Sequence, residues 1–495
     1  MKSNPRKPGA CRRVMIWSAA GFLAMVPLLG GQAVPADAQE LVGERLSLLP
    51  AQVRFGPGTV RLDGMGGFET VVPDENLEIN ALDFGRNPAG FGDDRDSWTV
   101  ELRYGHGEYA ERDRRLRGND VFMNEGSFRA GFYQPGNLGV GVQVDYAEVA
   151  ARDFARTRND FTIQGFEGVV SKYIARTISL GGEIRYDGET ENTFSPSIYN
   201  INHDNTTLRG GLGVAWHPAA GVVLGTRGEV IASQVDGEST SGFHTDTFDW
   251  SRPGGLYSFH GFVNRGRLRG GVDVTGQELN GDESVRISWS ERFVFNPTTE
   301  NVSKVLDTFA ENRTNTRVKT RWMFDVTPSL GVSAAAQNAT EDFEIVVNPN
   351  IIGSRDKANV EVSTSAYLGG VTWRSPSDRL LLAGELKVAS SEVKDRAAET
   401  RSTNTLDEVT GRLGGEYFLS EMVVARGGLV YANQDYSLET RPDLEGSYAT
   451  TRLATGLGIA PAGSIWRLDV SLDVDLSSDL DTKEKNFSAY IVHLF

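Results

Sequence analysis

The sequence WRLDVSLDVDL at residues 466–476 alternates strictly between apolar and polar residues. Side chains return to the same side of the chain at every second residue only in an extended strand, so this stretch predicts a β-strand with one apolar and one polar face. An acidic, turn-rich segment follows at 477–486, and residues 487–495 then alternate again. The sequence therefore predicts a β-hairpin over residues 466–495.

The same pattern recurs from Ser97 onward, where short turns and long polar connections alternate between the predicted strands. The eight short turns lie at residues 134–137, 174–177, 217–221, 264–266, 327–329, 374–378, 418–421 and 460–464. They join sixteen strands, and the first and last strands raise the number to about 18, within a range of roughly 14–18. An even number of strands suits a closed barrel, because an open sheet edge in lipid would leave backbone groups unpaired.

We therefore predict an all-β fold, a transmembrane antiparallel up-and-down β-barrel over residues 97–495 with short periplasmic turns and long extracellular loops. A soluble β-sandwich, propeller or solenoid is the alternative. It gives no reason for short and long connections to alternate along the whole chain. The longest connection is expected at about residues 276–312.

The N-terminus predicts the compartment. Residues 1–13 are basic, residues 14–29 are apolar, and Ala36-Asp37-Ala38 has the pattern of a cleavage site. This arrangement predicts a signal peptide over residues 1–38, export through the inner membrane, and a mature chain that begins at Gln39. The only cysteine, Cys11, lies within this leader, so disulfides and thiolate chemistry are excluded from the mature chain.

Composition narrows the function classes further. Mean hydropathy is −0.31, and beyond the leader no apolar run approaches the roughly 18 residues of a spanning helix, which excludes a helical membrane protein. The formal charge is −16, and removal of five basic residues and one acid with the leader changes it to −20. An acidic chain is a poor partner for nucleic acid. The expected surroundings are outer-membrane lipid and lipopolysaccharide, with divalent ions held near polar loops.

The closing segment ends in Phe495. A C-terminal strand that ends in Phe resembles the last strand of bacterial outer-membrane β-barrels. In that group the terminal aromatic residue is part of the signal that the barrel-assembly machinery reads. The resemblance implies that Phe495 is an assembly signal, that the machinery is a partner during biogenesis, and that the envelope is of the Gram-negative type.

A second resemblance lies in residues 39–96, which do not have the pattern of barrel wall. The string Leu62-Asp63-Gly64-Met65-Gly66-Gly67-Phe68, an acidic pair at 74–75 and Asn87-Pro88-Ala89-Gly90-Phe91 together resemble the N-terminus of the long-chain fatty-acid transporter superfamily and its type IX secretion relatives. In that superfamily the segment enters the barrel from the periplasmic side as a hatch.

The resemblance implies a periplasmic or luminal plug over residues 39–96. The candidate plug-turn residues are Gly64, Gly66, Gly67, Asn87, Pro88 and Gly90. One departure is Glu69-Thr70, where the superfamily more often has small apolar residues. The fatty-acid transporters also have fourteen strands rather than eighteen. The structural alternative is that these Gly and Asn-Pro sequences are ordinary turns.

The polar partners of the alternation are expected to face the interior of the barrel. They carry both signs of charge: Glu101, Arg103, Arg129, Asp145, Glu183, Arg185, Arg209, Arg227, Glu229, Arg267, Arg269, Asp273, Arg317, Lys319, Arg321, Asp325, Glu385, Lys387, Arg412, Glu416, Arg426, Arg452, Arg467, Asp469 and Asp473. Such walls either orient a polar or ionic solute in a water-filled pore or form a salt-bridge lattice that stiffens the wall or holds a plug. Both interpretations stay open at this point.

Enzymatic motifs are missing from the sequence. The six histidines are scattered without metal-ligand spacing, and His244 near Asp246 is a chance-level pattern. We expect no enzyme, no cofactor and no metal. The leading functional hypothesis is a porin-like channel for passive passage of a small polar or ionic solute. One alternative is a plugged barrel that takes up hydrophobic compounds, and another is a non-conducting adaptor of a secretion or envelope complex.

Overall fold

The structure is a computed structural model. It describes residues 60–70, 87–90, 97–110, 120–134, 138–152, 158–194, 200–241, 244–280, 288–291, 307–349, 356–395, 402–438, 446–460, 466–476 and 482–494. The predicted signal peptide and the predicted assembly signal Phe495 lie outside these residues, and both stay predictions.

Two short helical elements precede the strands within the described residues, α3 (Val60–Asp63) and the 3-10 turn η3 (Pro88–Gly90). The strands of the first half are β1 (Ser97–Ala110), β2 (Asp120–Gln134), β3 (Leu138–Arg152), β4 (Arg158–Ala175), β5 (Ile178–Phe194), β6 (Asn200–Ala219), β7 (Val222–Ser241), β8 (His244–Arg265), β9 (Leu268–Asn280) and β10 (Ser288–Glu291). Those of the second half are β11 (Asp307–Thr327), β12 (Leu330–Pro349), β13 (Asp356–Arg374), β14 (Leu380–Asp395), β15 (Ser402–Phe418), β16 (Val423–Leu438), β17 (Gly446–Ile459), β18 (Trp466–Asp475) and β19 (Thr482–Leu494).

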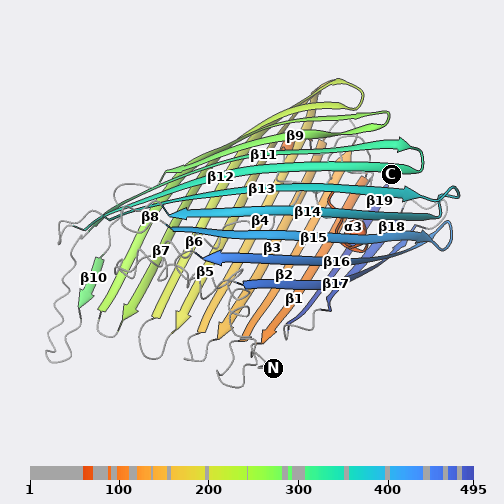
Figure 1. Ribbon diagram of the computed structural model, residues 1–495. Coiled ribbons are helices and arrows are strands. Elements are labelled where there is room, and N and C mark those ends of the chain that lie inside the picture. The colour runs from red at the N-terminus through yellow and green to blue at the C-terminus, as the bar shows by residue number, and fades with distance from the viewer. Residues whose placement is uncertain are drawn as a thin grey trace, which may run out of the picture.

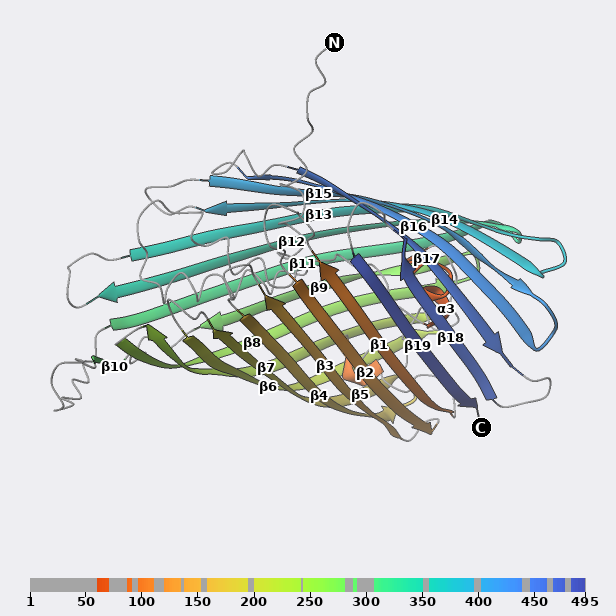
Figure 2. The ribbon, with the colours of Figure 1, turned by 90° about the horizontal axis from the view of Figure 1, so that it is seen from below.

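These nineteen strands of the described chain form one antiparallel sheet (Figures 1 and 2). Each long strand pairs with the strands before and after it, and β9 pairs with β11 because the four-residue β10 pairs only with the far end of β8. The first strand pairs on both sides, since Ser97 lies opposite Tyr133 of β2 and Leu494 of β19. Eighteen long strands therefore follow one another in an up-and-down order that returns to its start, and the predicted fold class is confirmed.

The six predicted short turns that lie within the described residues are at one end of the sheet, the right-hand end in Figure 1, and those at 134–137 and 460–464 lie largely outside the described residues. Their geometry explains their composition: Gly221 and Gly266 adopt positive φ angles of 69° and 60°, a conformation that glycine adopts without steric cost. The longest predicted connection is shorter than expected, because β9 continues to Asn280 and β11 already begins at Asp307. The strands on either side of this connection are therefore longer than the sequence pattern predicted.

The outward face of the sheet carries a continuous apolar band. In β5 the outward residues from Ile178 to Tyr186 are apolar or glycine, and eight steps of about 3.3 Å give a band about 26 Å long. One edge of the band carries exposed tyrosines: Tyr104, Tyr146, Tyr186, Tyr257, Tyr367 and Tyr431. The edge near the short turns carries exposed Trp216, Trp322, Trp373 and Tyr417. Nine residues of a tilted strand between two aromatic rims are about the length with which a transmembrane strand crosses a bilayer.

Among the described residues, no helix is long and apolar enough to cross a membrane.

Candidate functional site

The N-terminal residues 60–70 lie inside the barrel, where α3 packs against β17, β18 and β19. The helix ends after one turn because the backbone amide of Gly67 donates to the carbonyl of Leu62 at 2.8 Å. Gly66 and Gly67 have φ angles of +102° and +69°, which L side chains rarely adopt. The two glycines thus turn the chain so that Phe68 and Glu69 point into the barrel wall.

Apolar side chains and wall glycines hold this turn closely. Leu62, Met65 and Phe68 form one buried cluster with Leu381 and Ala383 of β14. On the neighbouring strands the wall residues are glycines. A Cβ added to Gly414 or Gly428 would overlap the carbonyl oxygen of Met65, and one added to Gly456 would lie 3.0 Å from the Cα of Gly64. The backbone of the N-terminal turn therefore packs directly on the backbone of the wall.

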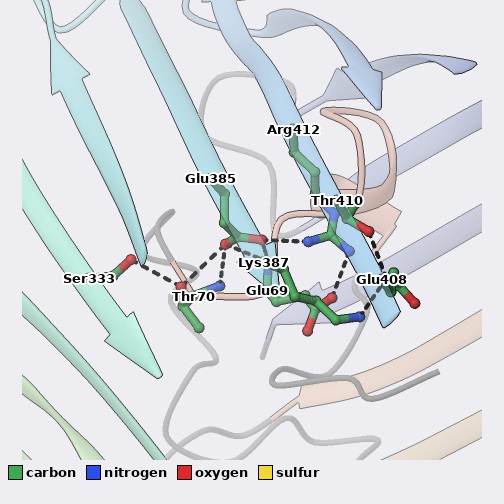
Figure 3. A network of polar contacts seen from close by, with 8 residues as sticks. All are labelled: Glu69, Thr70, Ser333, Glu385, Lys387, Glu408, Thr410 and Arg412. Carbon is green, nitrogen blue, oxygen red and sulfur yellow. Dashed lines mark hydrogen bonds and ion pairs between the residues drawn. The ribbon is translucent and has the colours of Figure 1, made fainter. Parts of the chain in front are cut away.

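Glu385 of β14 is the main polar acceptor for this turn (Figure 3). The backbone amides of Glu69 and Thr70 donate to its carboxylate at 3.1 and 3.0 Å. The Thr70 hydroxyl donates to the same carboxylate at 3.2 Å and lies 3.0 Å from the hydroxyl of Ser333 in β12. Because Glu385 is buried, these donors satisfy a carboxylate that water does not reach.

Arg412 of β15 joins the N-terminal turn to the wall by charge. Its guanidinium donates to Glu385 at 2.8 Å and to Glu69 at 2.7 Å. All three side chains are at most 9% exposed. One guanidinium therefore binds two buried carboxylates, one from the N-terminal segment and one from the barrel. Figure 3 also shows the neighbouring Lys387–Glu408 ion pair at 3.2 Å.

Two further ion pairs join α3 to the wall. Arg61 contacts Glu416 at 2.5 Å, and Asp63 contacts Arg103 of β1 at 3.3 Å. Glu416 also accepts from Arg426, which in turn binds Asp469 at 2.6 Å. We call residues 60–70, together with the strands that they contact, the helical dock.

A second segment, residues 87–90, lies against β5, β6 and β7 and also contacts β4. The side-chain amide of Asn87 donates to the backbone carbonyls of Val214 and Thr226 at 3.1 and 3.4 Å. The Ser179 hydroxyl donates to the carbonyl of Ala89 at 2.7 Å. We call residues 87–90, together with β5, β6 and β7, the turn dock.

The turn dock also packs backbone against backbone. A Cβ added to Gly181 would overlap Pro88 and Ala89, and one added to Gly213 would overlap the side-chain oxygen of Asn87. Ala89 is buried in an apolar cluster with Ala215, Val223 and Phe262. Only wall positions without a side chain admit the segment this closely.

The two docks lie at the same end of the barrel but on opposite walls. Gly456 is three residues from the end of β17, and Gly225, beside Asn87, is three residues from the start of β7. Both positions are close to the short turns. In the ring order, β6 and β16 are nine steps apart in either direction. The N-terminal segment therefore contacts both sides of the barrel at its short-turn end.

Farther from the short turns, the inner wall of β4 to β7 holds a second charged cluster. Arg185 contacts Glu167 at 3.2 Å and Asp187 at 2.9 Å. Arg227 contacts both Glu183, at 2.5 Å, and Glu229. Most of these predicted interior charges are therefore bound to other wall residues, as a salt-bridge lattice requires.

By contrast, the inner face of β13 is uncharged between Val360 and Thr372. Its inward positions are Val360, Val362, Thr364, Ala366, Leu368, Gly370 and Thr372. Ala366 and Leu368 form a buried apolar cluster with Ala335 of β12 and Ala389 of β14. The interior thus combines two charged walls with an uncharged stripe beside the helical dock.

The alternation in the described strands places nearly all the predicted interior residues on the inner face. Besides those already described, they are Glu101, Arg129, Asp145, Arg209, Arg269, Asp273, Arg317, Lys319, Arg321, Asp325, Arg452, Arg467 and Asp473. Arg267 is the exception, because it lies exposed in the turn between β8 and β9 and donates to the carbonyl of Val326 at 3.3 Å. The prediction was wrong for Arg267 because the alternation was extended beyond the start of β9 into the tight turn that precedes it.

Sequence reasoning missed several residues of the docks. Glu69 and Thr70 were noted only as departures from a family pattern, yet they bind Glu385 directly. Ser333, Ser179 and the inward glycines were not identified either. The sequence does contain a signal for the inward glycines. They occupy positions in the alternation at which other strands have a polar residue that faces the interior. Every candidate plug-turn residue lies in one of the docks.

No protein-family model matches the sequence, and no curated protein matches it. Solved structures similar in fold include the CymD monoaromatic hydrocarbon channel, with 13% identity over 90% of this chain and 98% of that chain and a TM-score of 0.35. The Ralstonia pickettii toluene transporter TbuX is 12% identical over 89% of this chain and 98% of that one, with a TM-score of 0.36. The ferric citrate transporter FecA is 8% identical over 81% and 79%, with a TM-score of 0.42. At such low sequence identities and TM-scores, these similarities say nothing about what the present chain does.

Proposed function

We propose that this chain is an outer-membrane transport protein whose barrel is plugged by its own N-terminal segment and which passes a small hydrophobic compound when the plug moves. The observation that carries the proposal is the attachment of residues 60–70 and 87–90 to opposite interior walls at the short-turn end. The short turns face the periplasm in this proposal, so the plug lies at the periplasmic exit.

The outer surface supports the membrane location. A sheet whose eighteen long strands all pair on both sides leaves no open edge around the barrel, which is the condition for strands to cross lipid. The outward band is apolar over about 26 Å and is bordered by aromatic side chains on both edges. The surface of a water-soluble protein does not need either feature.

The interior supports a plugged barrel over a permanently open pore. A porin orients ions with unpaired wall charges, whereas Arg185, Arg227 and Arg412 are each bound by two carboxylates. The uncharged inner face of β13, next to the helical dock, provides a path on which an apolar compound loses no charge–water interactions. This combination favours a hydrophobic over an ionic solute.

The test combines ion conductance with uptake of an uncharged fluorescent naphthylamine into vesicles that carry lipopolysaccharide in the outer leaflet. Wild-type protein is compared with Gly428→Val, in which the new side chain overlaps the Met65 carbonyl. The matched control is Gly427→Val, whose outward Cβ meets no atom within 4 Å. Folding of each variant is checked by the change in gel mobility on heating.

Wild-type protein is expected to take up the probe at least fivefold faster than empty vesicles without steady ion conductance. Gly428→Val is expected to conduct ions continuously, and Gly427→Val is expected to behave like wild type. Equal, steady conductance by all three proteins would overturn the proposal in favour of a porin for polar solutes. Folded protein with neither conductance nor uptake would favour the non-conducting adaptor.

A further inference from the structure

The two docks differ in the chemistry that the N-terminal segment brings to them. Residues 60–70 contribute three ionised side chains, Arg61, Asp63 and Glu69, and each binds an oppositely charged residue of the wall. Residues 87–90 are Asn, Pro, Ala and Gly, so they have no charged side chain to contribute. The turn dock depends on neutral hydrogen bonds and close packing alone.

If the N-terminal segment moved away from the wall, the wall groups left without its contacts would also differ between the two docks. At the helical dock, Glu385, Arg412 and Glu416 are almost fully buried, and withdrawal of residues 60–70 would remove a partner from each. Glu385 and Arg412 would keep each other and Glu416 would keep Arg426, but the charge-assisted hydrogen bonds lost on withdrawal are roughly twice as strong as neutral ones. This wall therefore opposes release of the segment.

At the turn dock, withdrawal leaves the Ser179 hydroxyl and the carbonyls of Val214 and Thr226. Water replaces a neutral hydrogen bond at small net cost. The glycines that remain, such as Gly213, have no side chains that must rearrange. This wall opposes release far less.

We infer that transport opens the turn dock while the helical dock stays bound, so that residues 87–90 are the moving gate and residues 60–70 are its fixed anchor. The inference rests on the proposed function, because it specifies which part of the plug moves. It assigns distinct roles to two segments that the sequence pattern placed in one plug.

Engineered disulfides test the inference, because the only cysteine of the chain, Cys11, lies in the predicted leader. A Cβ added to Gly213 lies 3.1 Å from the Cγ of Asn87, which is about where the sulfur of a cysteine at position 87 would lie. This spacing suits a disulfide of about 2.04 Å S–S length. Asn87→Cys also removes the oxygen that would overlap the new Cβ, so the pair Asn87→Cys/Gly213→Cys has room to form.

The helical dock is tethered by Thr70→Cys/Ser333→Cys, whose wild-type hydroxyl oxygens are 3.0 Å apart. The control is Thr207→Cys/Ser233→Cys, which joins β6 to β7 through residues whose hydroxyl oxygens are also 3.0 Å apart. This control introduces a disulfide into the wall without touching the plug. Each protein is assayed for naphthylamine uptake when oxidised and again after addition of reductant.

The oxidised turn-dock pair is expected to lose at least tenfold in uptake and to regain it on reduction. The oxidised helical-dock pair and the wall pair are expected to stay within twofold of their reduced forms. The inference is overturned if the helical-dock tether blocks uptake, alone or together with the turn-dock tether, or if neither tether changes it. Absence of uptake in wild type and in all reduced variants would instead count against the proposed function.

Discussion

The helical dock and the turn dock hold one N-terminal segment at the same end of the barrel by different means. In the helical dock, Arg412 binds Glu69 at 2.7 Å and Glu385 at 2.8 Å among side chains that are hardly exposed. In the turn dock, Asn87 donates to two backbone carbonyls across glycines. Both contacts are close, but only the first consists of charge-assisted hydrogen bonds between buried groups.

The two docks show that how closely a segment packs and how strongly it resists separation are separate properties. Inward glycines determine how near the segment comes to the wall in both docks. Buried ion pairs determine the cost of removing it, because the partner that stays behind is desolvated. The following substitutions test this distinction, and each is measured as the free energy of unfolding in urea of the refolded protein in lipid vesicles.

The largest effect is expected from Arg412→Met, which leaves Glu69 and Glu385 buried without their shared cation. The expected loss is about 3–5 kcal/mol, the usual cost of removing one partner from a buried ion pair. A loss below about 1 kcal/mol would mean that these carboxylates are neutral or hydrated, and the contrast between the docks would disappear.

Asn87→Ala should have a smaller effect. It removes two hydrogen bonds to backbone carbonyls, and at about 0.5–1.5 kcal/mol each the expected loss is roughly 1–3 kcal/mol. Uptake of the naphthylamine probe should increase or stay unchanged, because the gate is loosened. A loss as large as that of Arg412→Met would show that the turn dock is equally strong.

Ser179→Ala removes a single hydrogen bond to the Ala89 carbonyl, made at 2.7 Å. We expect a loss of about 0.5–1.5 kcal/mol. If the loss combined with Asn87→Ala is additive, the two residues hold the turn independently. A clear departure from additivity would indicate that Asn87 and Ser179 act as one unit.

The smallest effect is expected from Arg452→Met, an Arg→Met change of the same kind at an inner wall position away from the docks. Arg452 binds Asp473 at 3.2 Å, but the two side chains are 31% and 21% exposed. Because water screens such a pair, the expected loss is only about 0–1 kcal/mol. A loss equal to that of Arg412→Met would assign its effect to arginine in general and not to burial.

Much of the fold follows from local sequence signals. Period-two alternation, as in residues 466–476, identifies strands and their two faces, and the strand ends on either side of all eight predicted short turns lie within a few residues of the predicted positions. The glycine turn at 64–67 and the Asn-Pro turn at 87–88 were recognised as one N-terminal feature. In each case the signal spans only a few residues and needs no knowledge of distant partners.

The contacts within the docks did not follow from such signals. Glu69 and Glu385 are 316 residues apart, and their contact depends on the register of many intervening strand pairs. The same alternation that placed Arg412 and Arg452 on the inner face does not distinguish a buried contact with the N-terminal segment from a half-exposed wall pair. Arg267 was misplaced because a tight turn interrupts the alternation on which its position was inferred.

By itself, then, the sequence determined which segments are strands, which residues face inward and where the chain turns, since these depend on backbone periodicity and turn chemistry. Only the tertiary structure decided that glycines from six different strands admit the N-terminal segment, and that one side of that segment is held by charge and the other by neutral contacts. The reason is physical: closing the barrel brings polar atoms of residues hundreds of positions apart within hydrogen-bond distance of each other, and burial then sets the strength of each contact.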